Sequence, residues 1–99
     1  MTLGPTIDGG RLLARLDAFA AIGGTPAGGV NRPALGVEDR AARALLARLG
    51  AARGFSVFQD AAANLFLRRA GADNDRPPFL IGSHLDSQPT GGRFDGALG

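Results

Sequence analysis

The sequence contains no cysteine and no lysine, and it has a single histidine, His84. Without cysteine, the chain can form neither disulfide bonds nor thiolate metal sites. No apolar run approaches the roughly 20 residues that a membrane-spanning helix needs. Residues 1–8 lack the basic region and the long apolar core of a signal peptide. We therefore expect a cytoplasmic protein with no membrane partner.

The positive charge of the chain comes entirely from arginine. Its eleven basic residues give a net charge of only +2, and they are scattered along the chain with acidic residues between them. A nucleic-acid-binding domain usually concentrates its basic residues on one face and adds exposed aromatic side chains. We therefore expect no nucleic-acid partner.

A first amphipathic helix is predicted over residues 9–21. Asp8 is its expected N-cap, and apolar residues recur at helical spacing at positions 12, 13, 16, 19 and 20. The loop that follows, residues 25–36, contains two prolines and three glycines and is too long to be only a connector. Such a loop is either mobile or part of a site, and the sequence leaves both alternatives open.

A second helix is predicted from Val37 onward. Glu38 and Asp39 lie in its first turn, where the helix dipole favours negative charge. The helix is expected to end at Gly50 or, in preference, at Gly54. Its arginines lie off the apolar stripe, and we expect them to form a solvated face: Arg40, Arg43, Arg48 and Arg53.

The second half of the chain is predicted to form three strands. Residues 55–59 and 64–68 are the expected arms of a hairpin, and residues 79–82 follow a polar loop as a short, buried, central strand. Two helices followed by three strands indicate an α/β fold. A buried central strand needs neighbours on both sides and cover on both faces, so this sheet is expected to be incomplete.

Residues that can bind ligands gather after the third predicted strand, in residues 82–99. His84 and Asp86 are two positions apart, so in an extended chain their side chains share a face. Asp86 can then accept the second imidazole N–H. Asp95 can return to the same place across a loop containing Gly91 and Gly92. Imidazole and carboxylate without thiolate suit Zn²⁺, with Mn²⁺, Co²⁺ or Ni²⁺ as substitutes.

Spacing alone leaves structural alternatives open for these residues. His84 could be a hydrogen-bonded structural histidine, and Asp86 and Asp95 could be turn-forming residues. A phosphate-binding loop is excluded because neither the P-loop lysine nor the G-x-G-x-x-G spacing is present.

The sequence of residues 82–99, GSHLDSQPTGGRFDGALG, resembles the metal-binding signature of the amidase/hydantoinase/carbamoylase family. These are binuclear zinc amidohydrolases related to zinc exopeptidases, and they include N-carbamoyl-L-amino acid hydrolases, β-ureidopropionases and allantoate amidohydrolases. The resemblance extends upstream over nearly the whole chain: residues 7–13, 28–32, 38–43 and 60–65. The QPTGG wording at 88–92 is closer to the carbamoyl-amino-acid and ureidopropionate branch than to the allantoate branch.

The resemblance implies roles for the candidate residues. His84 would bind one metal ion, Asp95 would bridge two, and Asp86 would be the catalytic-site carboxylate behind His84. It also suggests a cis peptide between Asp95 and Gly96. In such an enzyme two divalent ions activate a water that cleaves the carbamoyl C–N bond of an N-carbamoyl or ureido acid substrate.

The resemblance further implies that residues 1–99 are the N-terminal part of a zinc-exopeptidase-like catalytic domain. The family's general-base glutamate, its remaining metal ligands and the domain that forms its homodimer would then follow Gly99. Glu38, the one glutamate, lies at a helix start and matches none of these roles. We therefore expect the 99 residues to be inactive alone. The alternatives are a non-catalytic binding or regulatory module built from the same parts, or an allantoate amidohydrolase-type activity in the full-length protein.

Overall fold

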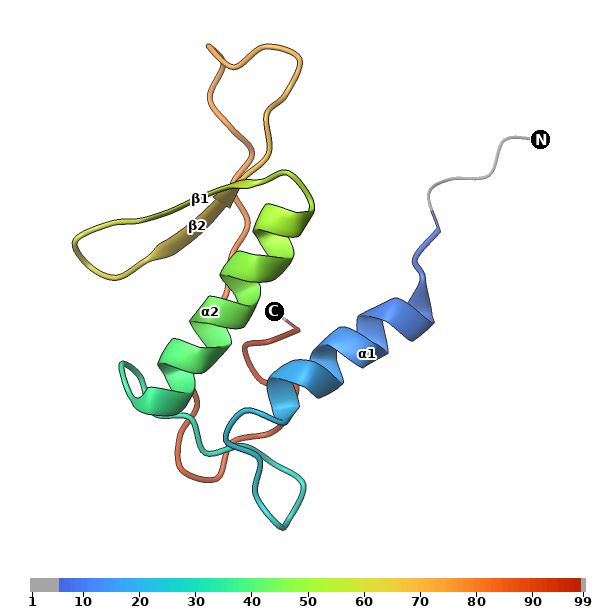
Figure 1. Ribbon diagram of the computed structural model, residues 1–99, viewed down its shortest axis with the longest axis vertical. Coiled ribbons are helices and arrows are strands. Elements are labelled where there is room, and N and C mark those ends of the chain that lie inside the picture. The colour runs from blue at the N-terminus through green and yellow to red at the C-terminus, as the bar shows by residue number, and fades with distance from the viewer. Residues whose placement is uncertain (1–5, 99) are drawn as a thin grey trace.

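The computed structural model describes residues 6–98 as two helices followed by a β-hairpin (Figure 1). The elements are α1 (Gly9–Ala20), α2 (Val37–Ala52), β1 (Ser56–Gln59) and β2 (Leu65–Arg68). The predicted α/β class, both helices and the hairpin are confirmed, with bounds that differ by one or two residues. No helix in the described part of the chain is long and apolar enough to cross a membrane.

The third predicted strand is wrong. Residues 79–82 have no regular secondary structure, and no backbone hydrogen bond to them is found among the described residues. Their side chains are exposed, from 92% at Phe79 to 74% at Leu80. A strand exists only through its hydrogen-bonded neighbours. The described chain places no such neighbour beside this segment.

Helix α1 begins where the sequence predicts, because the Asp8 side chain accepts a hydrogen bond from the Arg11 backbone N–H at 3.0 Å. Its buried residues are Leu16 and Phe19. The remainder of the predicted apolar stripe is only partly used, since Leu13 is 57% exposed.

Helix α2 ends before Gly54, which has a φ of +82° and supplies the expected left-handed stop. Gly50, the other candidate stop, instead lies inside the helix against β2: a Cβ on it would lie 2.3 Å from the Leu67 side chain. The solvated-face prediction is wrong for Arg43, which donates hydrogen bonds to the Gln59 side chain and the Ala63 carbonyl. Helix and hairpin are therefore fastened together.

The hairpin pairs β1 and β2 antiparallel, with Phe58 opposite Phe66. The two rings stack with centroids 4.8 Å apart. In the connecting turn, Asp60 accepts hydrogen bonds from the backbone N–H of Ala62 and from the backbone and side chain of Asn64. This Asx-type turn fixes the register locally.

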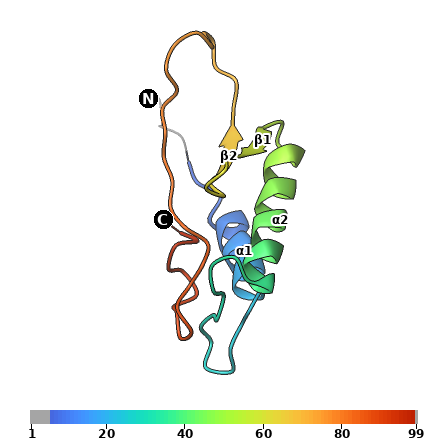
Figure 2. The same cartoon turned by 90° about the vertical axis from the view of Figure 1, so that its left-hand side faces the viewer.

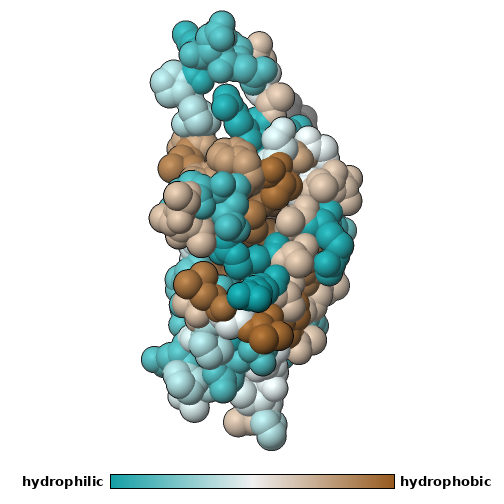
Figure 3. Space-filling view, turned by 60° about the vertical axis from the view of Figure 1, so that its left-hand side comes forward, coloured by the Kyte–Doolittle hydropathy of each residue, from teal (hydrophilic) through white to brown (hydrophobic). Residues whose placement is uncertain are grey.

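The core is small and the molecule is flat. Among the described residues, four apolar side chains are buried in the core (Leu16, Phe19, Val30 and Ala42). The dimensions are 45 × 42 × 19 Å. The radius of gyration is 15.2 Å, against about 13 Å for a compact chain of this length. In Figure 2 the orange-to-red C-terminal segment runs along one side and α2 along the other. Figure 3 shows hydrophobic side chains exposed at several places on one face.

Candidate metal centre

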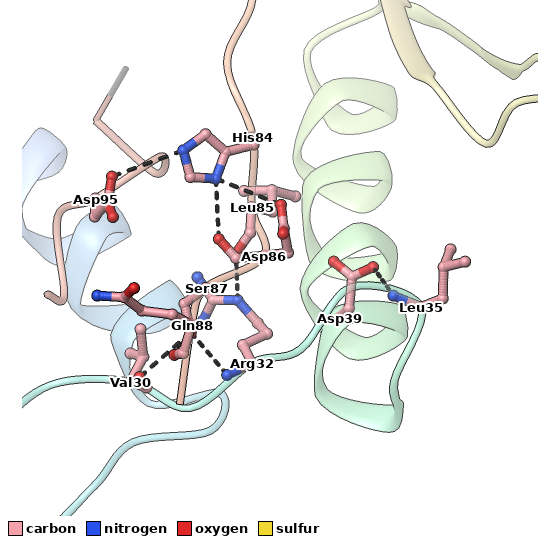
Figure 4. Close-up of polar contacts among 10 residues, drawn as sticks. All are labelled: Val30, Arg32, Leu35, Asp39, His84, Leu85, Asp86, Ser87, Gln88 and Asp95. Atoms are coloured by element: carbon pink, nitrogen blue, oxygen red, sulfur yellow. Dashed lines mark hydrogen bonds and ion pairs between the residues drawn. The ribbon is translucent and has the colours of Figure 1, made fainter. Parts of the chain in front are cut away.

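His84 lies between two carboxylates, as the spacing predicted (Figure 4). Its Nδ1 is 2.9 Å from the Asp86 carbonyl oxygen and 3.4 Å from the Asp86 carboxylate. Its Nε2 is 3.7 Å from the Asp95 carboxylate. The structure thus brings all three candidate residues together, with Asp86 and Asp95 facing opposite nitrogens of one ring.

This arrangement selects a tautomer of His84. The Asp86 carbonyl can only accept a hydrogen bond, so Nδ1 carries the proton and donates to it. In the neutral ring, Nε2 is then left with a lone pair that faces the Asp95 carboxylate. Two electron-rich atoms that face each other across 3.7 Å are a natural setting for a cation.

The segment that carries His84 is held by the long loop after α1. Val30, fully buried, exchanges two backbone hydrogen bonds with Gly91, at 2.9 and 3.0 Å. Arg32 exchanges two further bonds with Ser87: its N–H donates to the Ser87 hydroxyl, and its carbonyl accepts from the Ser87 N–H. Of the two alternatives for residues 25–36, the structure therefore supports the second, because this loop forms part of the scaffold of the site.

The segment that carries Asp95 is held by α1. Arg93, two residues before it, forms an ion pair with Asp17 near the end of that helix. The Asp95 N–H donates to the Gly92 carbonyl at 3.2 Å, which closes a tight turn. Both ends of the candidate site are thereby tied to the N-terminal third of the chain.

Gly96 lies directly against His84. Its φ is +75°, and a Cβ on it would lie 2.2 Å from the His84 carbonyl oxygen and 2.7 Å from Nδ1. The predicted cis peptide between Asp95 and Gly96 is wrong, since no cis peptide bond occurs in the described part of the chain. Close approach of two backbones and a left-handed φ account for the glycine without it.

Crystal structures of known proteins match this fold. An amidase of the hydantoinase/carbamoylase family from Burkholderia vietnamiensis is 48% identical, with a TM-score of 0.96 over 100% of this chain and 24% of that protein. A hydantoinase/carbamoylase family amidase from Burkholderia ambifaria is 55% identical, with a TM-score of 0.92 over 94% of this chain and 23% of that protein. The chain belongs to the hydantoinase/carbamoylase family.

The sequences of hydantoinase/carbamoylase relatives agree. The N-carbamoyl-L-amino acid amidohydrolase of Geobacillus stearothermophilus is 44% identical over 93 residues, which cover 94% of this chain and 23% of that protein. No family model matches the chain. The family resemblance and the fold class predicted from the sequence are confirmed. The chain spans about a quarter of the length of these amidohydrolase relatives.

The donor atoms fit one side of a metal site of the kind predicted for a hydantoinase/carbamoylase protein. Two ligands each about 2.1 Å from a tetrahedral Zn²⁺ lie about 3.4 Å apart, and His84 Nε2 and Asp95 are 3.7 Å apart. Both side chains are about half exposed, so an ion can reach them. Within residues 6–98, however, no group of three or more His, Cys, Asp or Glu residues could hold an ion. A metal site that used His84 and Asp95 would therefore need further donors.

Sequence reasoning missed three features of this candidate site. The close contact of Gly96 with His84 is one, because it forms only after the chain turns back. Asp17, paired with Arg93 across 76 positions, is another. The third is Arg32, fully buried although it carries a charge. No local pattern identifies such residues, since their partners are distant in the sequence.

Proposed function

We propose that the chain supplies two ligands of the metal centre of a metal-dependent amidohydrolase that cleaves the carbamoyl C–N bond of N-carbamoyl amino acids. The observation that carries the proposal is the setting of His84, whose Nδ1 is occupied by Asp86 while Nε2 faces Asp95. The names of the relatives support the substrate class.

Each residue has a distinct role in this proposal. His84 would hold an ion through Nε2, and the Asp95 carboxylate, which has two oxygens, would be the ligand shared between this ion and a second one. Asp86 holds the Nδ1 proton and thereby fixes the ring and increases its basicity as a ligand. When bound, divalent ions of the Zn²⁺ class supply Lewis acidity and a nucleophilic water at neutral pH.

The proposal includes inactivity of the 99 residues alone. A catalytic zinc has three protein ligands and one open position, whereas within residues 6–98 only His84 and Asp95 would face the proposed ion. The remaining ligands and the general base must therefore come from other polypeptide. We expect weak metal binding and no release of ammonia from N-carbamoyl-L-amino acids by the purified chain. Turnover by the chain alone would contradict this part of the proposal.

The metal site is tested by titrating the chain with Co²⁺ and following its visible absorption. We expect His84→Ala and Asp95→Asn to abolish the spectrum, and Asp86→Asn to weaken binding by about 10- to 100-fold, as for other groups that orient a metal ligand. Asp73→Asn removes a carboxylate in an exposed loop and is the matched control, with unchanged binding. A cobalt spectrum that survives His84→Ala would refute the ligand assignment.

The reaction is tested in a chimera in which this chain replaces the matching 93 residues of the Geobacillus stearothermophilus relative. We expect the chimera to hydrolyse N-carbamoyl-L-amino acids and His84→Ala to remove that activity. A folded, metal-loaded chimera that is inactive on these substrates would show that the chain serves a different reaction.

A further inference from the structure

Arg32 is a buried charge placed between α1 and the His84 segment. It is fully buried. Its Nη1 donates to the carbonyls of Phe19 and Ile22, both at 2.8 Å, and its Nε donates to the carbonyl of Leu85 at 2.7 Å. Phe19 lies in the last turn of α1 and Ile22 lies two residues past its end. At this end of a helix, carbonyl groups lack partners within the helix and the helix dipole is negative. One guanidinium therefore caps this helix and also donates a hydrogen bond to Leu85, the residue next to His84.

Burying the charged guanidinium at this position costs free energy. Burial lowers the pKa of Arg32 from its ordinary value, while the nearby carboxylates of Asp39 and Asp86 act to raise it. A buried charge persists only where hydrogen bonds and opposite charge replace its lost hydration. The remaining Nη2 has no hydrogen-bond partner among the described residues.

The hydrogen bonds of Arg32 bracket Asp86. Its side chain holds the carbonyl of Leu85, and its backbone exchanges two hydrogen bonds with Ser87, at 2.9 and 2.7 Å. Asp86 lies between these two anchored neighbours, and its backbone carbonyl accepts a hydrogen bond from Nδ1 of His84. The orientation of the imidazole thus depends on a segment whose two ends are both fixed by one residue (Figure 4).

We propose that Arg32 is a positioning residue for the metal centre. It fixes residues 85–87 so that the Asp86 carbonyl keeps the His84 proton on Nδ1 and leaves Nε2 facing Asp95. The role assigned to Nε2 rests on the proposed metal-binding function, but the effect of Arg32 on the histidine does not require a metal.

The test uses His84 as its own reporter, because the chain has no other histidine. Long-range ¹H–¹⁵N NMR of the metal-free chain, well above the ordinary histidine pKa of about 6.5, distinguishes the two neutral tautomers. We expect the Nδ1–H form to predominate in the wild type and Arg32→Met to give a mixture of both forms. Arg43→Met is the matched control: it removes two side-chain hydrogen bonds of an arginine at the hairpin, where Arg32→Met removes three beside the site, and it should keep the wild-type pattern.

A second variant covers the case in which Arg32→Met does not fold. Ser87→Ala removes the hydroxyl that accepts from the Arg32 N–H and leaves the buried charge in place, and it should shift the tautomers in the same direction. Persistence of the wild-type pattern in the folded variants would overturn the proposal, as would an equal shift in Arg43→Met.

The same variants separate this inference from the proposed function. We expect Arg32→Met to weaken Co²⁺ binding by about 10- to 100-fold, with no change in Arg43→Met. If the wild type binds no cobalt but Arg32→Met still mixes the tautomers, the metal function fails and the positioning role stands. If cobalt binds equally well to wild type and Arg32→Met, the positioning role fails and the metal function stands.

Discussion

Replacement of Gly96 by alanine tests the site at its tightest contact. The added Cβ would lie 2.2 Å from the His84 carbonyl oxygen, 2.7 Å from Nδ1 and 2.8 Å from Cε1. Real Cβ contacts essentially never fall below 3.0 Å, so the two backbone segments must separate by at least 0.8 Å. The contact is with backbone as well as with the ring, so a change of side-chain rotamer alone cannot relieve it.

The expected cost has two parts. At Gly96, with φ at +75°, an L-residue loses about 1–2 kcal/mol to left-handed strain. Forcing extra volume into a filled space costs about 1–3 kcal/mol more. The sum, about 2–5 kcal/mol, is a large fraction of the stability of an ordinary domain, about 5–15 kcal/mol. The separation of the two segments should also push His84 away from Asp95.

Two measurements on Gly96→Ala follow: Co²⁺ affinity from visible absorption, and the free energy of unfolding from urea titration followed by circular dichroism. We expect at least a tenfold loss of affinity together with the loss of stability. Gly92→Ala is the matched control, because this glycine lies in the same loop with no atom within 4 Å of the added Cβ. Gly96→Ala with the affinity and stability of Gly92→Ala would refute the packing argument.

Three further predictions concern the scaffold. Gly50→Ala should destabilise the chain by about 1–3 kcal/mol in urea titration, because its Cβ would overlap the Leu67 side chain. Hydrogen bonds from the side chain and backbone of Asn64 lower the pKa of Asp60 below its ordinary 3.8. The ionised Asp60 carboxylate should therefore stabilise the hairpin above pH 3.8, and this stabilisation should be lost as the pH falls through the lowered pKa of Asp60. The pH dependence is measured from the NMR signals of the hairpin, and it should be absent from Asp60→Ala. Asp8→Ala should cost about 1 kcal/mol, and Asp8→Ser only a few tenths, in the same urea assay.

The parts of the fold that the sequence predicts well are those decided by neighbours in the chain. Asp8 caps α1 through a residue three positions on, and Gly54 stops α2 through its own φ. The strand at 79–82 failed because a strand depends on a partner that local sequence does not describe. Its apolar composition is real, but composition alone cannot supply the hydrogen-bonding neighbour.

The candidate site also has parts that local sequence predicts and parts that depend on distant residues. The spacing of His84 and Asp86 predicted their contact because two positions of extended chain place both side chains on one face. Asp95 was expected to return to His84 across the loop that contains Gly91 and Gly92, and the structure brings it to Nε2. Arg32 escaped prediction because its burial is determined by carbonyls 10, 13 and 53 positions away.

The side-chain interactions that hold the site together join residues farther apart in the sequence than those that join α2 to the hairpin. The hydrogen bonds of Arg43 join α2 to the hairpin across 16 and 20 sequence positions. The hydrogen bond from Arg32 to Leu85 spans 53 positions, and the contact between Arg93 and Asp17 spans 76. Long-range contacts carry a larger loop-closure entropy, and they form later in folding than local ones. The helix–hairpin unit can therefore assemble first, and the His84–Asp95 site closes last. By the same reasoning it opens first, so amide hydrogens at residues 85–91 should exchange with solvent sooner than those of α2.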